Sequence, residues 1–117
     1  MDCDVAVLGG GPGGYSAAIR AAPLGAKVVC IGQAKTLGGT CLNVGCIPTK
    51  AWVQTAHAIK DAAETFAKLG VKVGPPELDF AQSNVWKAGV VTGLTSGVAG
   101  LLKANGVEWV KGYGTFK

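Results

Sequence analysis

The stretch DVAVLGGGPGGYSAAIRAAPLGAKVVCI, residues 4–31, decides the fold. An apolar run ends in a cluster of glycines, a segment of helical composition follows, and a second apolar run ends at Ile31. This order predicts a strand, a tight turn, a helix and a second strand. Two strands joined through a helix lie parallel and form a right-handed crossover. Residues 4–31 therefore predict a βαβ unit and an α/β fold class.

The glycine cluster, GGGPGG at residues 9–14, contains a phosphate-binding pattern. Its glycines satisfy G-x-G-x-x-G directly after a strand and at the start of a helix. The first glycine permits a tight turn, the second lets the backbone approach a pyrophosphate, and the third lets the helix pack closely on the strand. Backbone N–H groups and the helix dipole would hold the phosphates. The pattern predicts a Rossmann-like dinucleotide site formed by Gly9, Gly11, Pro12, Gly13 and Gly14.

One residue of that fingerprint is missing. The fingerprint places an Asp or Glu at the end of the second strand, where its carboxylate hydrogen-bonds the ribose. This sequence has Gly32 and Gln33 at that point. We expect ribose binding to be weakened, and Gln33 is a candidate for an amide hydrogen bond in place of the carboxylate.

A pair of cysteines follows in GGTCLNVGCIPTK, residues 38–50. Pro48 suits the first turn of a helix, so the sulfurs of Cys41 and Cys46 are expected at or just before a helix N-terminus. The positive end of a helix dipole lowers the pKa of a thiol and favours the reactive thiolate. Neighbouring glycines would allow a flat cofactor ring to approach one of the sulfurs.

Three other readings of these cysteines stay open: a zinc site, a structural disulfide and two inert buried thiols. Zinc needs two further ligands, whereas His57 is the only histidine and Cys3 and Cys30 are interpreted as small buried hydrophobes. A structural disulfide is unusual in a protein without a secretion signal. Redox chemistry at Cys41 and Cys46 is favoured, and no metal is expected.

The rest of the chain extends the α/β pattern. Apolar residues at three- and four-residue spacing predict a helix over about 48–69, and a second helix over about 80–104, although several glycines weaken the second prediction. A proline-containing loop separates them, and residues 107–110 predict a third strand. Three strands are few for a doubly wound sheet, so we interpret residues 1–117 as an incomplete domain.

Composition excludes several function classes. The formal net charge of +4 comes from dispersed Lys and Arg residues, so no nucleic-acid footprint is predicted. The longest uninterrupted apolar runs are the size of strands, so no membrane span is expected. The first residues, MDCDVAVL, contain no targeting signal of the usual kinds, which predicts a cytoplasmic protein or one that is already processed.

The segment 38–50, together with DVAVLGGGPGGYSAAIRAA upstream and GYGTF at residues 112–116, closely resembles the dihydrolipoamide dehydrogenases. These belong to the pyridine nucleotide-disulfide oxidoreductases, flavoproteins with two dinucleotide-binding domains. The resemblance covers the N-terminal part of the FAD domain only. The spacer 42–45 followed by Ile47 looks more like the lipoamide enzymes than the glutathione or mercuric reductases, which are the alternatives within the family.

The resemblance implies a role for each matching residue. Cys41 would be the interchange thiol that meets the dithiol substrate, and Cys46 would be the partner next to the flavin that forms the charge-transfer thiolate. Lys50 would place a positive charge near the isoalloxazine ring and help to depress the pKa of Cys46. The remaining residues implied to contact FAD are Gly38, Gly39, Thr40 and Gly114.

The resemblance also implies the reaction and the partners. Dihydrolipoamide would reduce a Cys41–Cys46 disulfide, and electrons would pass through FAD to NAD+. Lipoyl domains of 2-oxo acid dehydrogenase or glycine cleavage complexes would be the partners, and the full-length enzyme would be a homodimer in the cytoplasm or the mitochondrial matrix. The isolated chain is expected to be inactive, and the other reading is a stand-alone FAD-binding or thiol-redox module without hydride transfer.

Overall fold

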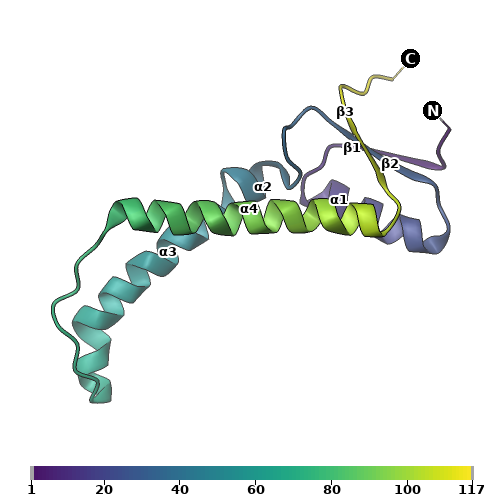
Figure 1. Ribbon diagram of the computed structural model, residues 1–117. Coiled ribbons are helices and arrows are strands. Elements are labelled where there is room, and N and C mark those ends of the chain that lie inside the picture. The colour runs from purple at the N-terminus through teal and green to yellow at the C-terminus, as the bar shows by residue number, and fades with distance from the viewer. Residues whose placement is uncertain (1, 117) are drawn as a thin grey trace.

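Three strands form one parallel sheet, which confirms the predicted α/β class. In the computed structural model, which describes residues 2–116, β1 (Val5–Leu8), β2 (Val28–Gly32) and β3 (Glu108–Lys111) lie side by side in the order β1-β2-β3. Both neighbouring pairs are parallel (Figure 1). Met1 and Lys117, the ends of the predicted segment 1–117, lie outside the described residues.

The first crossover is the predicted βαβ unit. Helix α1 (Pro12–Ala21) starts with proline at its first position, where a missing N–H costs no helical hydrogen bond. A short 3₁₀ turn, η1 (Ala22–Leu24), ends at Gly25 with φ of 96°, a left-handed conformation that glycine adopts without strain. The chain then enters β2, whose first three residues are buried.

The second crossover is long and contains all the remaining helices. Because both crossovers step the same way along the sheet, right-handed connections place their helices on the same face. Helix α4 (Phe80–Ala104) accordingly contacts both α1 and β3. The buried core lies where these elements meet, and it consists of Ala18, Val28, Cys30, Leu37, Leu42, Val98, Leu102 and Val107.

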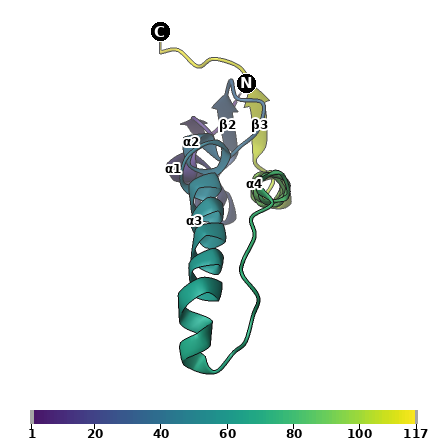
Figure 2. The same cartoon turned by 90° about the vertical axis from the view of Figure 1, so that its left-hand side faces the viewer.

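A helical hairpin projects away from the sheet. Helix α3 (Cys46–Lys60) continues through a π-helical turn, η2 (Asp61–Thr65), and a 3₁₀ turn, η3 (Phe66–Leu69), so the helical segment predicted over about 48–69 is not a single α-helix. A loop returns to α4, which spans the same residues as the predicted second helix. The molecule measures 62 × 26 × 19 Å, with the hairpin along its length (Figures 1 and 2).

Polar and aromatic contacts join α3 to the first turns of α4. The hydroxyl groups of Thr55 on α3 and Ser83 on α4 share a hydrogen bond of 3.0 Å. The rings of Trp52 and Phe80 stack with centroids 6.1 Å apart, and the Lys87 ammonium lies 4.5 Å from the centroid of the Trp52 ring. Asp79 caps α4 by accepting a 2.9 Å hydrogen bond from the backbone N–H of Gln82.

Helix α4 is more apolar over its full length than the short apolar runs of the sequence indicate. By length and mean hydropathy of 1.3, it could cross a membrane, and 17% of the relevant window is buried. Lys87 and Lys103 lie within the helix, which also contacts α1, α3 and β3. This one helix is weak support for a membrane span.

Strand β1 is less buried than an apolar strand of a parallel sheet usually is. Val5 and Leu8 are exposed, whereas Val28 and Val29 of β2 are buried. The reason is position: β2 has a neighbour on both sides, while β1 has one neighbour within residues 2–116.

Candidate functional site

The glycine turn between β1 and α1 has the tight geometry that its sequence predicts. Gly9 adopts φ of 100°, and its N–H donates a 2.7 Å hydrogen bond to the carbonyl of Ile31 on β2. A Cβ atom at Gly14 would lie 1.8 Å from the carbonyl oxygen of Gly9. Only glycine fits at position 14, because a side chain there would force the start of α1 away from β1.

The N-terminus of α1 is suited to an anion. The first N–H groups of a helix have no intrahelical acceptor, and no side chain caps this helix. Its first turn also contains no acidic residue, so nothing of negative charge competes for the positive end of the dipole. Pro12 and Gly13 are exposed, and Gly11 is half-buried, so the turn is open to a ligand.

The cysteine segment is joined directly to the glycine turn. The N–H of Gly38 donates a 2.7 Å hydrogen bond to the carbonyl of Gly10. Gly39, at φ of 59°, lies so close to the turn that a Cβ atom on it would be 2.8 Å from the Cα of Gly11. The structure therefore brings the two predicted motifs, which are far apart in sequence, into one site.

The cysteines occupy different places on two helices. Cys41 is the third residue of the short helix α2 (Gly39–Asn43), a helix that was not predicted between the glycines and Cys46. Cys46 is the first residue of α3, at the N-terminus as expected. Both are free thiols in the structure, with Cys46 exposed and Cys41 half-buried.

The protonation of Cys41 also differs from the prediction of a lowered pKa. The neighbouring Cys46 raises the pKa of Cys41, first through a hydrogen bond between the side chains and also through its charge, and partial burial raises it further. The Lys50 ammonium and a backbone hydrogen bond at Cys46 act in the opposite direction. The prediction from the helix dipole did not include the contact between the two thiols, which is the first cause of the raised pKa of Cys41.

Asn43 holds the segment in shape, and sequence analysis assigned it no role. Its side-chain amide donates hydrogen bonds to the carbonyls of Leu37, at 3.1 Å, and Gly39, at 2.9 Å. Its side-chain oxygen accepts a 2.7 Å hydrogen bond from the Thr36 hydroxyl. The role of Asn43 could have been predicted from its position between the two cysteines, because asparagine side chains often form hydrogen bonds with nearby backbone groups.

The other predicted site residues surround this segment. Thr40 and Lys50 are exposed, and Gly38 is buried. Gly38 has φ of 103°, and a Cβ atom there would meet the side chain of Leu42 at 2.6 Å. Glycine is thus required at the point where the chain turns from the Gly10 contact into α2.

The remaining candidate residues stay outside this site. His57 is exposed on α3, and residues 2–116 contain no cluster of metal-ligating side chains. Cys30 is fully buried in β2, and burial raises the pKa of its thiol. Cys3 was also interpreted as buried, but it is half-exposed because it precedes the edge strand β1.

A second part of the site lies at the carboxyl ends of the strands, where α/β folds bind ligands. A cavity of about 260 Å³ is lined by Leu8, Gly9, Ile31, Gly32, Gln33, Gly112, Tyr113 and Gly114. Gly114 packs against Leu8, because a Cβ atom at Gly114 would lie 2.5 Å from the Leu8 Cδ2. The segment that follows β3 therefore packs closely on β1, and this packing places Gly114 at the cavity.

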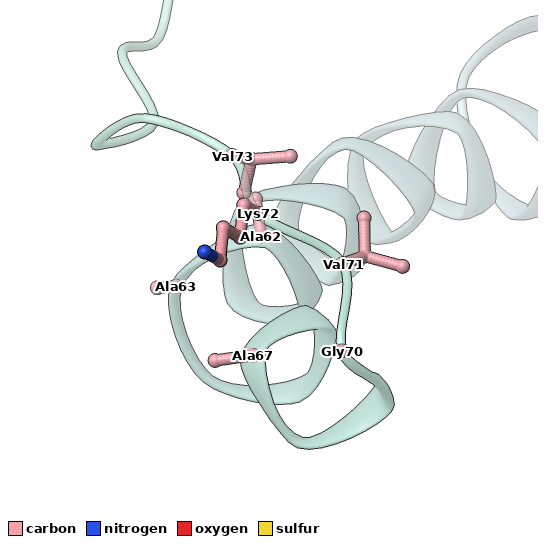
Figure 3. Close-up of a pocket in the computed structure, with 7 residues that line it drawn as sticks. All are labelled: Ala62, Ala63, Ala67, Gly70, Val71, Lys72 and Val73. Carbon is pink, nitrogen blue, oxygen red and sulfur yellow. The ribbon is translucent and has the colours of Figure 1, made fainter.

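A larger cavity lies elsewhere, at the tip of the hairpin (Figure 3). It measures about 520 Å³, and its lining consists of Ala62, Ala63, Ala67, Gly70, Val71, Lys72 and Val73. No acid, histidine or cysteine is among these residues, so the cavity offers Lys72 as its one ionisable group. We therefore place the chemistry at the glycine turn and the cysteine segment.

The chain is similar to proteins of one family. Residues 3–117 match the family described as "Pyridine nucleotide-disulphide oxidoreductase". The chain is 52% identical to "Leghemoglobin reductase" of Vigna unguiculata, over 97% of this chain and 22% of the relative. It is 53% identical to "Dihydrolipoyl dehydrogenase, mitochondrial" of Pisum sativum, over 97% of this chain and 23% of the relative.

A solved structure shares the fold. The flavoprotein disulfide reductase RclA from Escherichia coli, in its Cu(II) complex, superposes with a TM-score of 0.72 at 27% identity, over 95% of this chain and 22% of that one. The chain thus spans between a fifth and a quarter of the length of these relatives.

Proposed function

The chain belongs to the pyridine nucleotide-disulphide oxidoreductase family, and we propose that it forms the flavin-phosphate turn and the redox disulfide of a dihydrolipoamide dehydrogenase. The observation that carries this proposal is the 2.7 Å hydrogen bond from Gly38 to Gly10, because it joins a phosphate-binding turn to a cysteine pair. A disulfide reductase needs these two parts together.

The residues present fit FAD. The open N-terminus of α1 suits the pyrophosphate, and the cavity at the strand ends suits the adenosine. We assign the pyrophosphate to Gly9, Gly11, Pro12, Gly13 and Gly14, and the adenosine end to the cavity that Gly114 lines. When bound, FAD supplies the two-electron chemistry that links the cysteines to NAD+.

The flavin ring would lie along the cysteine segment. Gly38, Gly39 and Thr40 precede the first cysteine and would line this part of the site. Lys50 is close enough to the cysteine pair for its charge to lower the pKa of Cys41. That position supports a role for Lys50 as the positive charge beside the ring.

The two cysteines would exchange a disulfide with the substrate. One thiolate of a dithiol attacks the Cys41 sulfur of the oxidised pair, the bond between Cys41 and Cys46 breaks, and Cys46 leaves as a thiolate. The second substrate thiolate then attacks the substrate sulfur bound to Cys41, which closes the substrate disulfide and releases the Cys41 thiolate. Two electrons pass to the cysteine pair, and one disulfide replaces another.

The whole-enzyme activity follows as part of the proposal. The substrate would be protein-bound dihydrolipoamide, the final acceptor NAD+, and the partners the lipoyl domains of 2-oxo acid dehydrogenase or glycine cleavage complexes. We further propose a homodimer in the cytoplasm or the mitochondrial matrix, with no nucleic-acid or membrane partner. The 117-residue chain alone would not turn over lipoamide.

The test combines flavin binding with thiol chemistry. The oxidised chain is incubated with FAD, separated from free cofactor, and treated with dihydrolipoamide, after which alkylation and mass spectrometry count the thiols at each cysteine. We expect bound FAD, a Cys41–Cys46 disulfide before treatment, and two new thiols with an altered visible flavin spectrum after it. A Cys3→Ser variant should behave in the same way, whereas Cys41→Ser and Cys46→Ser should form no such disulfide.

The outcomes separate the candidate functions. Bound flavin that stays oxidised while the disulfide is reduced would support a stand-alone binding module without electron transfer to the flavin. Oxidation that leaves Cys41 and Cys46 as thiols would contradict the proposed redox role.

A further inference from the structure

The cavity at the strand ends has an uncharged wall. Its lining contains neither an acid nor a base, although β2 ends there at Gly32, the position at which dinucleotide-binding folds carry the ribose-binding carboxylate. Gln33 is the one lining side chain with an amide. The ribose end of the site therefore differs from the usual fingerprint in charge as well as in shape.

The fold does not require glycine at position 32. The backbone of Gly32 does not have the positive φ that favours glycine. A Cβ atom at this position would have its nearest contact with the Gly10 nitrogen at 3.7 Å, an ordinary van der Waals distance. Its carbonyl accepts a 3.1 Å hydrogen bond from the Gly112 N–H, so the position is fixed in the sheet. The lack of a carboxylate is a property of the ligand site and not a demand of the backbone.

That nearest contact also shows where a side chain would go. Gly10 belongs to the glycine turn, so a carboxylate at position 32 would project toward the bound dinucleotide. There it would accept hydrogen bonds from ribose hydroxyls, and it would repel a phosphate attached to the same ribose. With glycine at position 32, the site has neither the hydrogen bond to the ribose hydroxyls nor the repulsion of a ribose phosphate. The lining also contains no Lys or Arg that would attract such a phosphate.

We propose that this site does not discriminate at the adenosine ribose, and that it accepts an adenine nucleotide with either a free 2′-hydroxyl or a 2′-phosphate. Affinity would come from the pyrophosphate at the glycine turn and from the cavity walls. The inference rests on the proposed function, because it assumes that the cavity holds the adenosine half of a dinucleotide.

The test measures binding of two fragments by calorimetry, ADP-ribose and its 2′-phosphorylated form. The chain should bind both with dissociation constants within about threefold of each other. Gly32→Glu should bind ADP-ribose about tenfold more tightly and the 2′-phosphate form about tenfold more weakly, because a charged hydrogen bond is gained in one and a repulsion in the other. Gln54→Glu, which adds the same charge on the exposed face of α3, should match the unmodified chain.

A preference of tenfold or more for ADP-ribose in the unmodified chain would overturn the inference and leave nucleotide binding intact. That comparison needs no variant, so a poorly folded Gly32→Glu protein would not obscure it, and Gly32→Asp provides a second acidic side chain. Unchanged affinities in a folded acidic variant would also overturn the inference. If neither fragment binds to any of these proteins, the nucleotide-binding function itself is overturned.

Discussion

The backbone nitrogen of Gly38 lies 2.7 Å from the carbonyl oxygen of Gly10, and this hydrogen bond fixes the start of the cysteine segment on the phosphate turn. Leu37, the residue before Gly38, is buried in the core, so the attachment is stabilised by packing as well as by hydrogen bonding. A displacement of the glycine turn would therefore also move Cys41 and Cys46.

Gly14→Ala should destabilise the chain, whereas Gly13→Ala should not. The added methyl group at position 14 would overlap the Gly9 carbonyl, and we expect the free energy of unfolding to fall by about 3 kcal/mol. Position 13 has open space and a helical conformation, so alanine there should leave stability unchanged or raise it by up to about 1 kcal/mol. Urea unfolding of both variants provides the comparison, and equal stabilities would contradict the proposed close packing.

Cys46→Ala should lower the pKa of Cys41. Cys46 supplies the largest cause of the raised pKa, so its removal should increase the thiolate fraction of Cys41 at mildly alkaline pH. The rate of Cys41 alkylation by iodoacetamide, followed by mass spectrometry on the reduced protein, should then reach its midpoint at a lower pH. Lys50→Met should move the midpoint to a higher pH, because the lysine charge lowers this pKa. A shift of both variants in the same direction would contradict this account.

Asp79→Ala should weaken the start of α4. The carboxylate accepts the N–H of Gln82, and loss of such a cap costs about 1 kcal/mol. Far-UV circular dichroism during urea unfolding measures the change. Glu77→Ala removes a carboxylate from the same loop, and its stability should stay close to that of the unmodified chain. The capping interpretation fails if the two variants lose the same stability.

Thr55 and Ser83 should show energetic coupling. Ser83 is buried, and its hydrogen bond with Thr55 connects α3 to α4. A double-mutant cycle of Thr55→Val and Ser83→Ala should give a coupling energy of about 1 kcal/mol in unfolding experiments. Thr49→Val, at the exposed start of α3, combined with Ser83→Ala should give a coupling near zero. Additive effects in the first cycle would show that the hydrogen bond contributes nothing.

Local patterns predicted the parts of the fold that local chemistry determines. The βαβ unit follows from apolar runs and glycines that are adjacent in sequence, and α4 follows from apolar residues at three- and four-residue spacing. Likewise, G-x-G-x-x-G specifies Gly14 because the close contact it makes is with Gly9, only five residues away.

Features that depend on contacts between distant segments were not predictable in the same way. The raised pKa of Cys41 depends on how two helices orient two thiols, and the exposure of β1 depends on which strand lies beside it. The contact between Gly38 and Gly10 depends on where the chain returns after β2, which no single motif encodes.

The projecting hairpin affects how the molecule behaves in scattering measurements. Its radius of gyration is 19.6 Å, whereas a compact chain of the same length would have about 13 Å, and 19.6 Å is typical of a compact domain of about 300 residues. An apparent mass read from molecular dimensions against compact standards would therefore suggest an oligomer even for a single copy. Sedimentation equilibrium or multi-angle light scattering, which weigh the particle independently of its shape, are the methods that count copies of this chain correctly.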